Sequence, residues 1–340
     1  MEKHTLTKLS QDELIEFIES LGEKKFRANQ IFSWIWAKNA SSFDDMTDVK
    51  KEFRAKLSEI CQIFDCKIKT RQISSDGTVK YLIEFQDGLC AETVLMRFDN
   101  RSNLSMCVSS QVGCKMGCIF CATGKNGFKR NLLPHEIISQ ILLAQIDTGL
   151  KITNVVFMGQ GEPLDNFENV KKALELINKN LQISIRRITL STSGIIPKIL
   201  ELANSTLVPT LAISLHAPNH ETREKIMPVE KKYNLAELKK ALLEYSKKTK
   251  DRVTIEYILI KDLNDSTACA KELIEFLKDL KCNINLIPYN SVDDKFQKPD
   301  KKTMMKFKYL LEESGKKVTI RLERGADIDA ACGQLAGKIQ

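Results

Sequence analysis

The feature that most constrains the fold is a regular alternation of strand-like and helix-like segments between residues 105 and 322. Short apolar runs are typical of strands, and longer amphipathic runs separate them. The predicted strands are Ser105–Ser109, Asn154–Met158, Arg187–Ser191, Thr210–Leu215, Val253–Ile260, Ile284–Pro288 and Val318–Leu322. The predicted helices are Pro134–Thr148, Phe167–Asn178, Ile196–Ala203, Leu235–Lys247, Ala268–Leu280 and Lys302–Glu313. Six or more strand–helix units predict a parallel sheet in a full or partial barrel, with its chemistry at the carboxyl ends of the strands.

The residues before this region follow two other patterns. Residues 9–59 carry helical periodicity, with Ser10 as a predicted N-cap. Val79–Phe85 and Glu92–Met96 alternate with period two around the turn Gln86–Gly88, which predicts a β-hairpin. The predicted parts are a helical N-terminal domain (1–66), a hairpin extension (67–99), the barrel (100–323) and a C-terminal tail (324–340).

Composition excludes several classes of protein. The chain is 43% hydrophobic and 28% charged, as in globular proteins. It has no apolar run of the ~20 residues that a membrane span needs, and its first residues lack the apolar core of a secretory signal. We therefore expect a cytoplasmic protein with no membrane contact. The net charge of +8 suits a polyanionic partner. The ten cysteines, kept reduced, favour metal or catalytic chemistry over a disulfide framework.

Three of these cysteines follow the first predicted core strand. Cys114, Cys118 and Cys121 form a C-x3-C-x2-C loop. Such close thiolates cannot form a strain-free set of disulfides, but they can converge on one soft metal centre. Structural zinc needs four protein ligands, and no neighbouring His or Cys completes that set. An iron–sulfur cluster with three cysteine ligands leaves one iron open for catalysis. An RNA-binding protein with structural zinc is the alternative from another functional class.

With its aromatic residue before the last cysteine, this loop resembles the radical S-adenosylmethionine (SAM) superfamily. The resemblance implies an α/β fold, a partial (βα)6 barrel, and one [4Fe-4S] cluster ligated by Cys114, Cys118 and Cys121. It also implies that the open iron binds the amino and carboxylate groups of SAM. One electron from the cluster then cleaves SAM to a 5′-deoxyadenosyl radical.

Contacts to SAM are expected where the following strands end. Gly159–Pro163, after the second core strand, resembles the GGEP-type motif of the superfamily, which implies that Gly161 and Glu162 contact SAM. Gln160 stands where the related proteins commonly have Met, and we expect little consequence. The later strand ends resemble the SAM-contact set of one subfamily: Ser191, Ser214, Leu215, His216 and Asn285.

Two more cysteines lie outside the loop. Spacing alone favours a small buried hydrophobe for Cys107, and it makes Cys332, which is flanked by small residues, only a candidate. The segments Cys107–Cys114 (CVSSQVGC) and Asp327–Leu335 (DIDAACGQL), however, resemble the RlmN/Cfr family of RNA adenine methyltransferases. The resemblance extends over nearly the whole chain.

The family reaction implies a role for each of these thiols. One SAM methylates Cys332, and a second SAM supplies the radical that removes a hydrogen from the new S-methyl group. The methylene radical adds to an adenine ring carbon and crosslinks protein to RNA. Cys107 then forms a transient disulfide with Cys332 and releases the methylated base. Glu92 matches the position proposed as proton acceptor. Such chemistry predicts that the surroundings of both thiols lower their pKa.

The family contains two subgroups that differ in the adenine carbon they modify. One methylates C2 of an adenine in the peptidyl-transferase centre of 23S rRNA, and often the adenine 3′ of a tRNA anticodon. The other methylates C8 of the same rRNA adenine and confers antibiotic resistance. Pro163 and the segment Phe43–Thr47 resemble the C2 group more closely. The expected partners are 23S rRNA, tRNA and an electron donor such as a flavodoxin or ferredoxin system, with the enzyme acting as a monomer.

Overall fold

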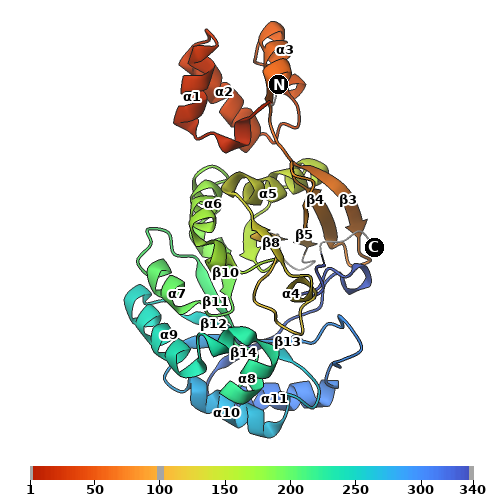
Figure 1. The fold of residues 1–340 in the computed structure, drawn as a ribbon, viewed down its shortest axis with the longest axis vertical. Coiled ribbons are helices and arrows are strands. Elements are labelled where there is room, and N and C mark those ends of the chain that lie inside the picture. The colour runs from red at the N-terminus through yellow and green to blue at the C-terminus, as the bar shows by residue number, and fades with distance from the viewer. Residues whose placement is uncertain (1–2, 98–102, 337–340) are drawn as a thin grey trace.

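The computed structural model describes residues 3–97 and 103–336, so the predicted boundary between residues 99 and 100 lies outside the described residues. The N-terminal part is helical and lies at one end of the fold (Figure 1), with core residues that belong to the same hydrophobic cluster as those of the barrel. Its elements are β1 (His4–Thr5), α1 (Gln11–Ser20), α2 (Lys25–Trp36), α3 (Lys51–Ile60) and β2 (Cys61–Gln62). The predicted N-cap is present, because Ser10 Oγ accepts a hydrogen bond from the Glu13 amide (3.2 Å). None of the helices in the described residues is long and apolar enough to cross a membrane.

One curved sheet organises the remainder of the chain. Its order is β14-β13-β12-β11-β10-β9-β6-β5-β4-β3, and β6 and β9 to β14 run parallel. The parallel strands are β6 (Leu104–Cys107), β9 (Asn154–Phe157), β10 (Ile188–Thr192), β11 (Thr210–Ser214), β12 (Val253–Leu259), β13 (Cys282–Pro288) and β14 (Lys317–Ile320). The intervening helices are α5 (Pro134–Thr148), α6 (Phe167–Lys179), α7 (Ile196–Leu202), α8 (His220–Ile226), α9 (Leu235–Thr249), α10 (Thr267–Leu277) and α11 (Lys301–Glu313). The predicted partial barrel is confirmed.

The antiparallel extension is larger than the sequence predicted. The hairpin is present as β4 (Val79–Glu84) and β5 (Cys90–Arg97), but β3 (Lys67–Ile73) adds a third strand. The sequence analysis included residues 67–99 in this extension but named no strand at β3, because its residues are mostly exposed and show no clear apolar alternation. Strand β5 pairs with β6, so the extension continues the barrel sheet rather than standing beside it.

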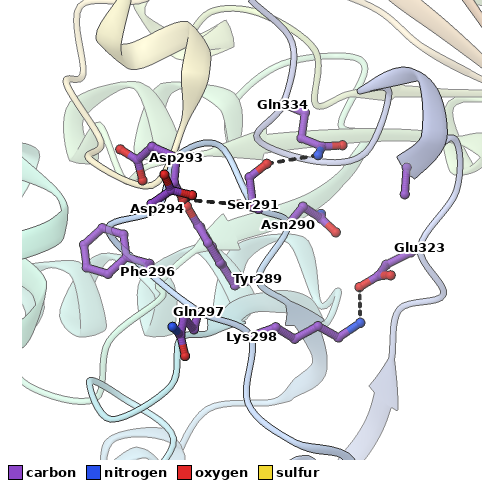
Figure 2. A pocket seen from close by; sticks show the side chains of 11 residues that line it. Tyr289, Asn290, Ser291, Asp293, Asp294, Phe296, Gln297, Lys298, Glu323 and Gln334 are labelled. Carbon is purple, nitrogen blue, oxygen red and sulfur yellow. Dashed lines mark hydrogen bonds and ion pairs between the residues drawn. The ribbon is translucent and has the colours of Figure 1, made fainter.

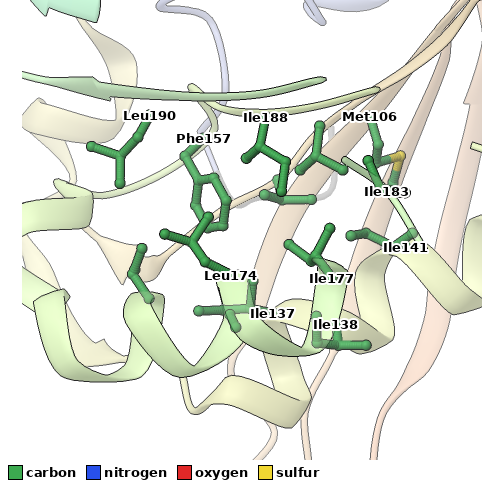
Figure 3. Packing of buried hydrophobic residues seen from close by; sticks show 14 of the residues in the cluster. Met106, Ile137, Ile138, Ile141, Phe157, Leu174, Ile177, Ile183, Ile188 and Leu190 are labelled. Carbon is green, nitrogen blue, oxygen red and sulfur yellow. The ribbon is translucent and has the colours of Figure 1, made fainter. Parts of the chain in front are cut away.

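The core that supports the site lies between the sheet and helices α5 and α6. Figure 3 shows Ile137 and Ile141 of α5 and Ile177 of α6 facing Met106 and Phe157 of the sheet. All five side chains are buried. Dense packing of this kind fixes the strands that carry the first two loops of the site.

The N-terminal helices are joined to the barrel through a buried carboxylate. Asp65 lies 2.9 Å from Lys8 Nζ and 3.1 Å from Nε2 of His135, at the start of α5. Burial raises the pKa of Asp65, but the hydrogen bonds from His135 and Lys8 outweigh that effect and lower it to about 2. A second contact joins Gln145 Nε2 to Asn39 Oδ1 (2.9 Å). Asp65 therefore connects the two parts as an ionised group.

We expect Asp65→Asn to lower the free energy of unfolding by about 1–3 kcal/mol at pH 7, because the variant loses a charged hydrogen-bond acceptor. The folded pKa of about 2 lies below the ordinary value of ~3.9. The stabilisation is therefore complete above pH ~4 and is lost as the pH falls through ~2. Urea unfolding at pH 7 and pH 3 measures it. The difference between the two proteins should narrow at pH 3, and the exposed variant Asp279→Asn should match the unmodified protein throughout.

Candidate active site

The cysteine loop lies just beyond the carboxyl end of β6. It is framed by the antiparallel strands β7 (Gln111–Gly113) and β8 (Phe128–Asn131), and it leads into α4 (Ala122–Lys125). Cys114, Cys118 and Cys121 line one cavity. The structure therefore brings together the three predicted cluster ligands.

Backbone contacts fix the shape of this loop. The amide of Cys114 donates to the carbonyl of Gly127 (3.0 Å), and the amide of Cys121 donates to the carbonyl of Cys118 (3.2 Å). Gly113 has φ +76°, and a Cβ there would lie 1.9 Å from the Gly127 carbonyl oxygen. Only glycine permits this close crossing of two backbone segments.

The donor set fits an iron–sulfur cluster. Burial raises the pKa of Cys114 to about 12, and the pKa of Cys118 is raised well above its ordinary value by burial and by the charges of the other two thiols. Crowded thiolates need a cationic centre, and soft thiolate ligands select iron–sulfur clusters among others. In the described part of the chain, no three His, Cys, Asp or Glu side chains are grouped to hold a single metal ion. An iron–sulfur cluster does not need such a group, because each thiolate binds a different iron.

The next wall of the cavity is the turn after β9. Gly161 has φ +98°, and a Cβ there would lie 2.6 Å from Gln111 Cβ, so the turn packs directly on β7. The Glu162 carboxylate accepts hydrogen bonds from the amides of Ser193 (2.7 Å) and Leu164 (3.0 Å). Burial raises the pKa of Glu162, although these hydrogen bonds oppose the shift. Gly161 and Glu162 both line the cavity, as the motif predicted.

Gln160 has a structural role that the sequence analysis did not assign. Its side chain is buried, and Oε1 accepts a hydrogen bond from the Glu92 amide on β5 (3.0 Å). Its own amide donates to Ser109 Oγ (2.8 Å). This contact argues against the expectation of little consequence, because the Gln160 side chain joins the turn after β9 to the antiparallel extension.

The predicted SAM contacts from the later strands fall into two groups. Ser191, Ser214 and His216 line the cavity, with the two serine hydroxyls 3.3 Å apart. Leu215 is fully buried in the core, and its amide donates to the Glu256 carbonyl (3.0 Å). Asn285 lines a neighbouring cavity instead. The structure therefore brings three of the five to the cysteine loop and places the other two behind or beside it.

His216 presents a defined neutral ring to the cavity. Burial, and then the nearby Arg223 cation, lower its pKa to about 3. Its Nδ1 accepts a hydrogen bond from the Ile258 amide (3.1 Å), so Nε2 carries the hydrogen. The ring also meets Phe120 of the cysteine loop edge to face, with centroids 5.0 Å apart. His216 can therefore donate one hydrogen bond to a ligand without carrying charge.

Sequence reasoning missed Glu256, which lies on β12 and lines both this cavity and the neighbouring one. Its Oε1 accepts a hydrogen bond from Asn285 Nδ2 (3.0 Å), while Oε2 is buried with no partner among the described residues. Burial raises its pKa, and the Arg321 cation opposes the shift. The available signal was a single acidic residue within an apolar strand. An unpartnered buried oxygen facing a cavity fits a ligand that donates hydrogen bonds.

Cys107 and Cys332 are close to one another. Cys107 on β6 packs in a small apolar cluster with Ala330 and Leu335 of the tail. Burial, and then the charge of Cys332, raise the pKa of Cys107 to about 12, while Arg321 opposes them. The expectation of a lowered pKa is therefore wrong for Cys107, because burial dominates. Both are free thiols, and Cys332 lines the cysteine-loop cavity and the neighbouring cavity.

Hydrogen bonds to two other parts of the chain hold the tail backbone at Cys332 and Gly333. The Ala122 amide of α4 donates to the Gly333 carbonyl (2.7 Å), and Asn290 Nδ2 donates to the Cys332 carbonyl (3.0 Å). Figure 2 shows a pocket beside this segment, in which Gln334 Nε2 donates to the Ser291 carbonyl (3.1 Å). The backbone of Cys332 is therefore held at the mouth of the barrel.

The predicted proton acceptor, Glu92, lies on β5. Its side chain is buried and forms an ion pair with Lys80 Nζ (3.1 Å). It lines neither of the two cavities that Cys332 lines.

An open parallel barrel with three cysteines in the loop after its first parallel strand is the architecture of a radical SAM enzyme. The model of the Radical SAM superfamily matches residues 108–277. The model of the ribosomal RNA large subunit methyltransferase N-terminal domain matches residues 4–63. The chain belongs to the RlmN family. It is thus a SAM-dependent RNA methyltransferase of the radical SAM type, with a [4Fe-4S] cluster and SAM as its cofactors.

Similarity to relatives extends over the full length. The chain is 48% identical to the probable dual-specificity RNA methyltransferase RlmN of Clostridioides difficile, covering 99% of this chain and 98% of the relative. It is also 48% identical to the dual-specificity RNA methyltransferase RlmN of a Marinomonas species, covering 99% and 94%. The crystal structure of a radical SAM methyltransferase from Sphaerobacter thermophilus superposes with a TM-score of 0.93 at 38% identity, covering 98% of this chain and 100% of that one.

We expect Gln160→Met to lower the free energy of unfolding by about 1–3 kcal/mol, because the buried Glu92 amide loses its acceptor. Thermal or urea unfolding of the full chain measures the change. Gln182→Met, at an exposed position on a loop, serves as the matched control. Equal stability of the two variants would contradict the structural role of Gln160.

Proposed function

We propose that this enzyme methylates C2 of an adenine in the peptidyl-transferase centre of 23S rRNA, and also the adenine 3′ of the anticodon in some tRNAs. The observation that carries the proposal is the position of Cys332, which lines the cofactor cavity in a tail segment whose Ala330 and Leu335 pack in one apolar cluster with Cys107. Relatives named dual-specificity RNA methyltransferases support two kinds of RNA substrate. An enzyme that acts on these RNAs would work in the cytoplasm, which is the location we propose.

The proposed cofactor site uses the cavity beside the cysteine loop. Cys114, Cys118 and Cys121 ligate the cluster, while Gly161 and Glu162 hold the amino group of SAM. The rest of SAM would be bound by the hydroxyls of Ser191 and Ser214 and by one N–H of His216. The proposed set also includes Asn285, which lines the neighbouring cavity, and the backbone of the buried Leu215. Cluster and SAM together supply a carbon-centred radical, which suits adenine C2 because that carbon is electron-poor and resists ordinary displacement by SAM.

Cys332 and Cys107, the two thiols outside the loop, are proposed to act in successive steps of methyl transfer. Cys332 would take a methyl group from one SAM. The 5′-deoxyadenosyl radical derived from a second SAM would remove one hydrogen from this methyl group and leave as 5′-deoxyadenosine, so that the methylene carbon on Cys332 could bond to the adenine carbon. The resulting adduct must lose one proton and one electron: Glu92 would accept the proton that leaves the ring carbon, and the oxidised cluster would take back the single electron. Cys107 Sγ then attacks Cys332 Sγ. The disulfide forms, the carbon–sulfur bond breaks, and the methyl carbon keeps the electron pair and takes up a proton. Proximity of the thiols supports this resolution step.

The helical domain, residues 1–66, is proposed to hold the RNA around the target base, which must leave its stack to reach the barrel. The cations beside the cysteine loop support RNA binding less than their number suggests, because three of them are paired with carboxylates. Lys115 is paired with Asp165 (2.8 Å), Lys125 with Asp293, and Arg130 with Glu136 (2.7 Å). A flavodoxin or ferredoxin system as electron donor and a monomeric state complete the proposal.

We expect Cys118→Ser to prevent cluster assembly, because two thiolates and a hydroxyl do not replace three thiolates. Iron and acid-labile sulfide per chain, measured after anaerobic reconstitution, should fall by at least about tenfold. Cys269→Ser, at a half-buried thiol on α10 outside the cavity, should retain both. Stoichiometric zinc without sulfide in the unmodified protein would contradict the ligand assignment and favour a structural zinc site.

We expect Cys332→Ala to abolish methylation of the target adenine, because no sulfur remains to carry the methyl carbon. Cys107→Ala should instead accumulate a covalent protein–RNA adduct, because the step that releases the base is missing. Mass spectrometry of RNA deuterated at adenine C2 or C8 reads both the product and its position. Methylation by the Cys332→Ala protein would contradict the mechanism, and loss of the C8 label would assign the enzyme to the C8 subgroup.

A further inference from the structure

Lys80 is a buried cation with partners in two separate parts of the chain. Its Nζ lies 3.1 Å from Glu92 Oε1, and the two side chains are only 8% and 3% exposed. The same Nζ donates to the carbonyl of Asp329 (3.4 Å), three residues before Cys332. In the register of β4 and β5, Lys80 faces Val94 and Leu82 faces Glu92, so Lys80 and Glu92 are diagonal neighbours on one face of the sheet.

The turn that precedes β4 also holds the tail. Ser74 Oγ donates to Asp327 Oδ1 (2.5 Å), the Ser75 amide donates to Asp327 Oδ2 (3.0 Å), and the Gly325 amide donates to Asp76 Oδ2 (3.1 Å). These contacts fasten the tail to the extension but do not involve Glu92. Lys80 connects the tail to the buried carboxylate of Glu92, because its Nζ contacts both Glu92 and Asp329.

A buried ammonium and a buried carboxylate depend on each other. Removing one partner leaves an uncompensated charge away from water, which is strongly unfavourable. If Glu92 loses its charge, the Lys80 ammonium has only neutral acceptors, the Asp329 carbonyl and the neutral carboxyl of Glu92, and these do not compensate the lost hydration of a buried cation. The cation then leaves the site, and Asp329 loses its donor.

We propose that Lys80 is a positioning residue that makes the placement of residues 327–332 depend on the charge of Glu92. This inference rests on the proposed roles of Glu92 and Cys332. When Glu92 accepts the proton from the adenine carbon, its charge changes from −1 to 0 while Lys80 keeps its own proton. The hold on Asp329 weakens at that stage, and the tail can shift so that Cys107 reaches the sulfur of Cys332.

Hydrogen–deuterium exchange of the full chain, reconstituted with cluster and SAM and without RNA, tests this link. We expect Lys80→Met to speed exchange in the tail peptide that contains residues 325–332 by roughly tenfold, as loss of a charged hydrogen bond implies. Exchange should rise more in this tail peptide than in β4 and β5, whose backbone ladder is retained. Lys80→Arg should restore slow exchange. Lys69→Met, which removes the exposed ion pair with Glu84 (2.6 Å) on the neighbouring strand, is the matched control and should leave the tail unchanged.

The charge dependence is tested in a second arm. Glu92→Gln should speed exchange in the same peptide as much as Lys80→Met, and the double variant should add nothing further, because both substitutions remove one connection. Tail exchange in Lys80→Met equal to that in Lys69→Met overturns the proposal. If Lys80→Met does not fold, Glu92→Gln decides, and an unchanged tail in that variant overturns the proposal. Neither readout requires methylation, so failure here is distinct from failure of the proposed reaction, which Cys332→Ala tests.

Discussion

The site depends on the return of the C-terminal tail to the first strand and loop of the barrel. The Gly333 carbonyl accepts from the Ala122 amide, and the Leu335 carbonyl accepts from Thr123 Oγ1 (2.6 Å). Leu335 also packs in the apolar cluster around Cys107. Bringing such distant parts of a chain together costs entropy that these contacts must offset. Without this closure, Cys332 would be remote from both the cofactor cavity and its partner thiol.

Much of the architecture was readable from the sequence because periodicity reports burial. The alternating segments predicted the open barrel, and the hairpin pattern predicted β4 and β5. The failure at β3 has the opposite cause, since an exposed strand carries no apolar pattern. The cysteine loop and the turn at Gly161 and Glu162 were predictable as well, because their residues are contiguous. Leu215 and Asn285 were predicted from strand ends and from the resemblance to the SAM-contact set of one subfamily, and neither shows which side chains face a given cavity.

The residues that the sequence did not reveal act through partners on other elements. Glu256 lies in an apolar strand, and its unpartnered oxygen becomes visible only when the cavity is built. Lys80 occupies a position in an alternating strand that is typical of a solvated cation, yet it is buried against Glu92. Gln160 reaches β5 across the sheet. For Cys107 the chemistry suggested an acidic thiol, whereas burial sets the pKa in the opposite direction.

Because the barrel is not closed, the sheet ends in two edge strands among the described residues, and β3 is one of them. Unpaired strand margins invite pairing with other chains, and charged side chains are a common defence. Lys67, Lys69 and Arg71 alternate along β3, with partners Glu84 and Asp147 on its inner side. The polar composition that gives this strand no apolar pattern in the sequence therefore also disfavours pairing of its edge with another chain.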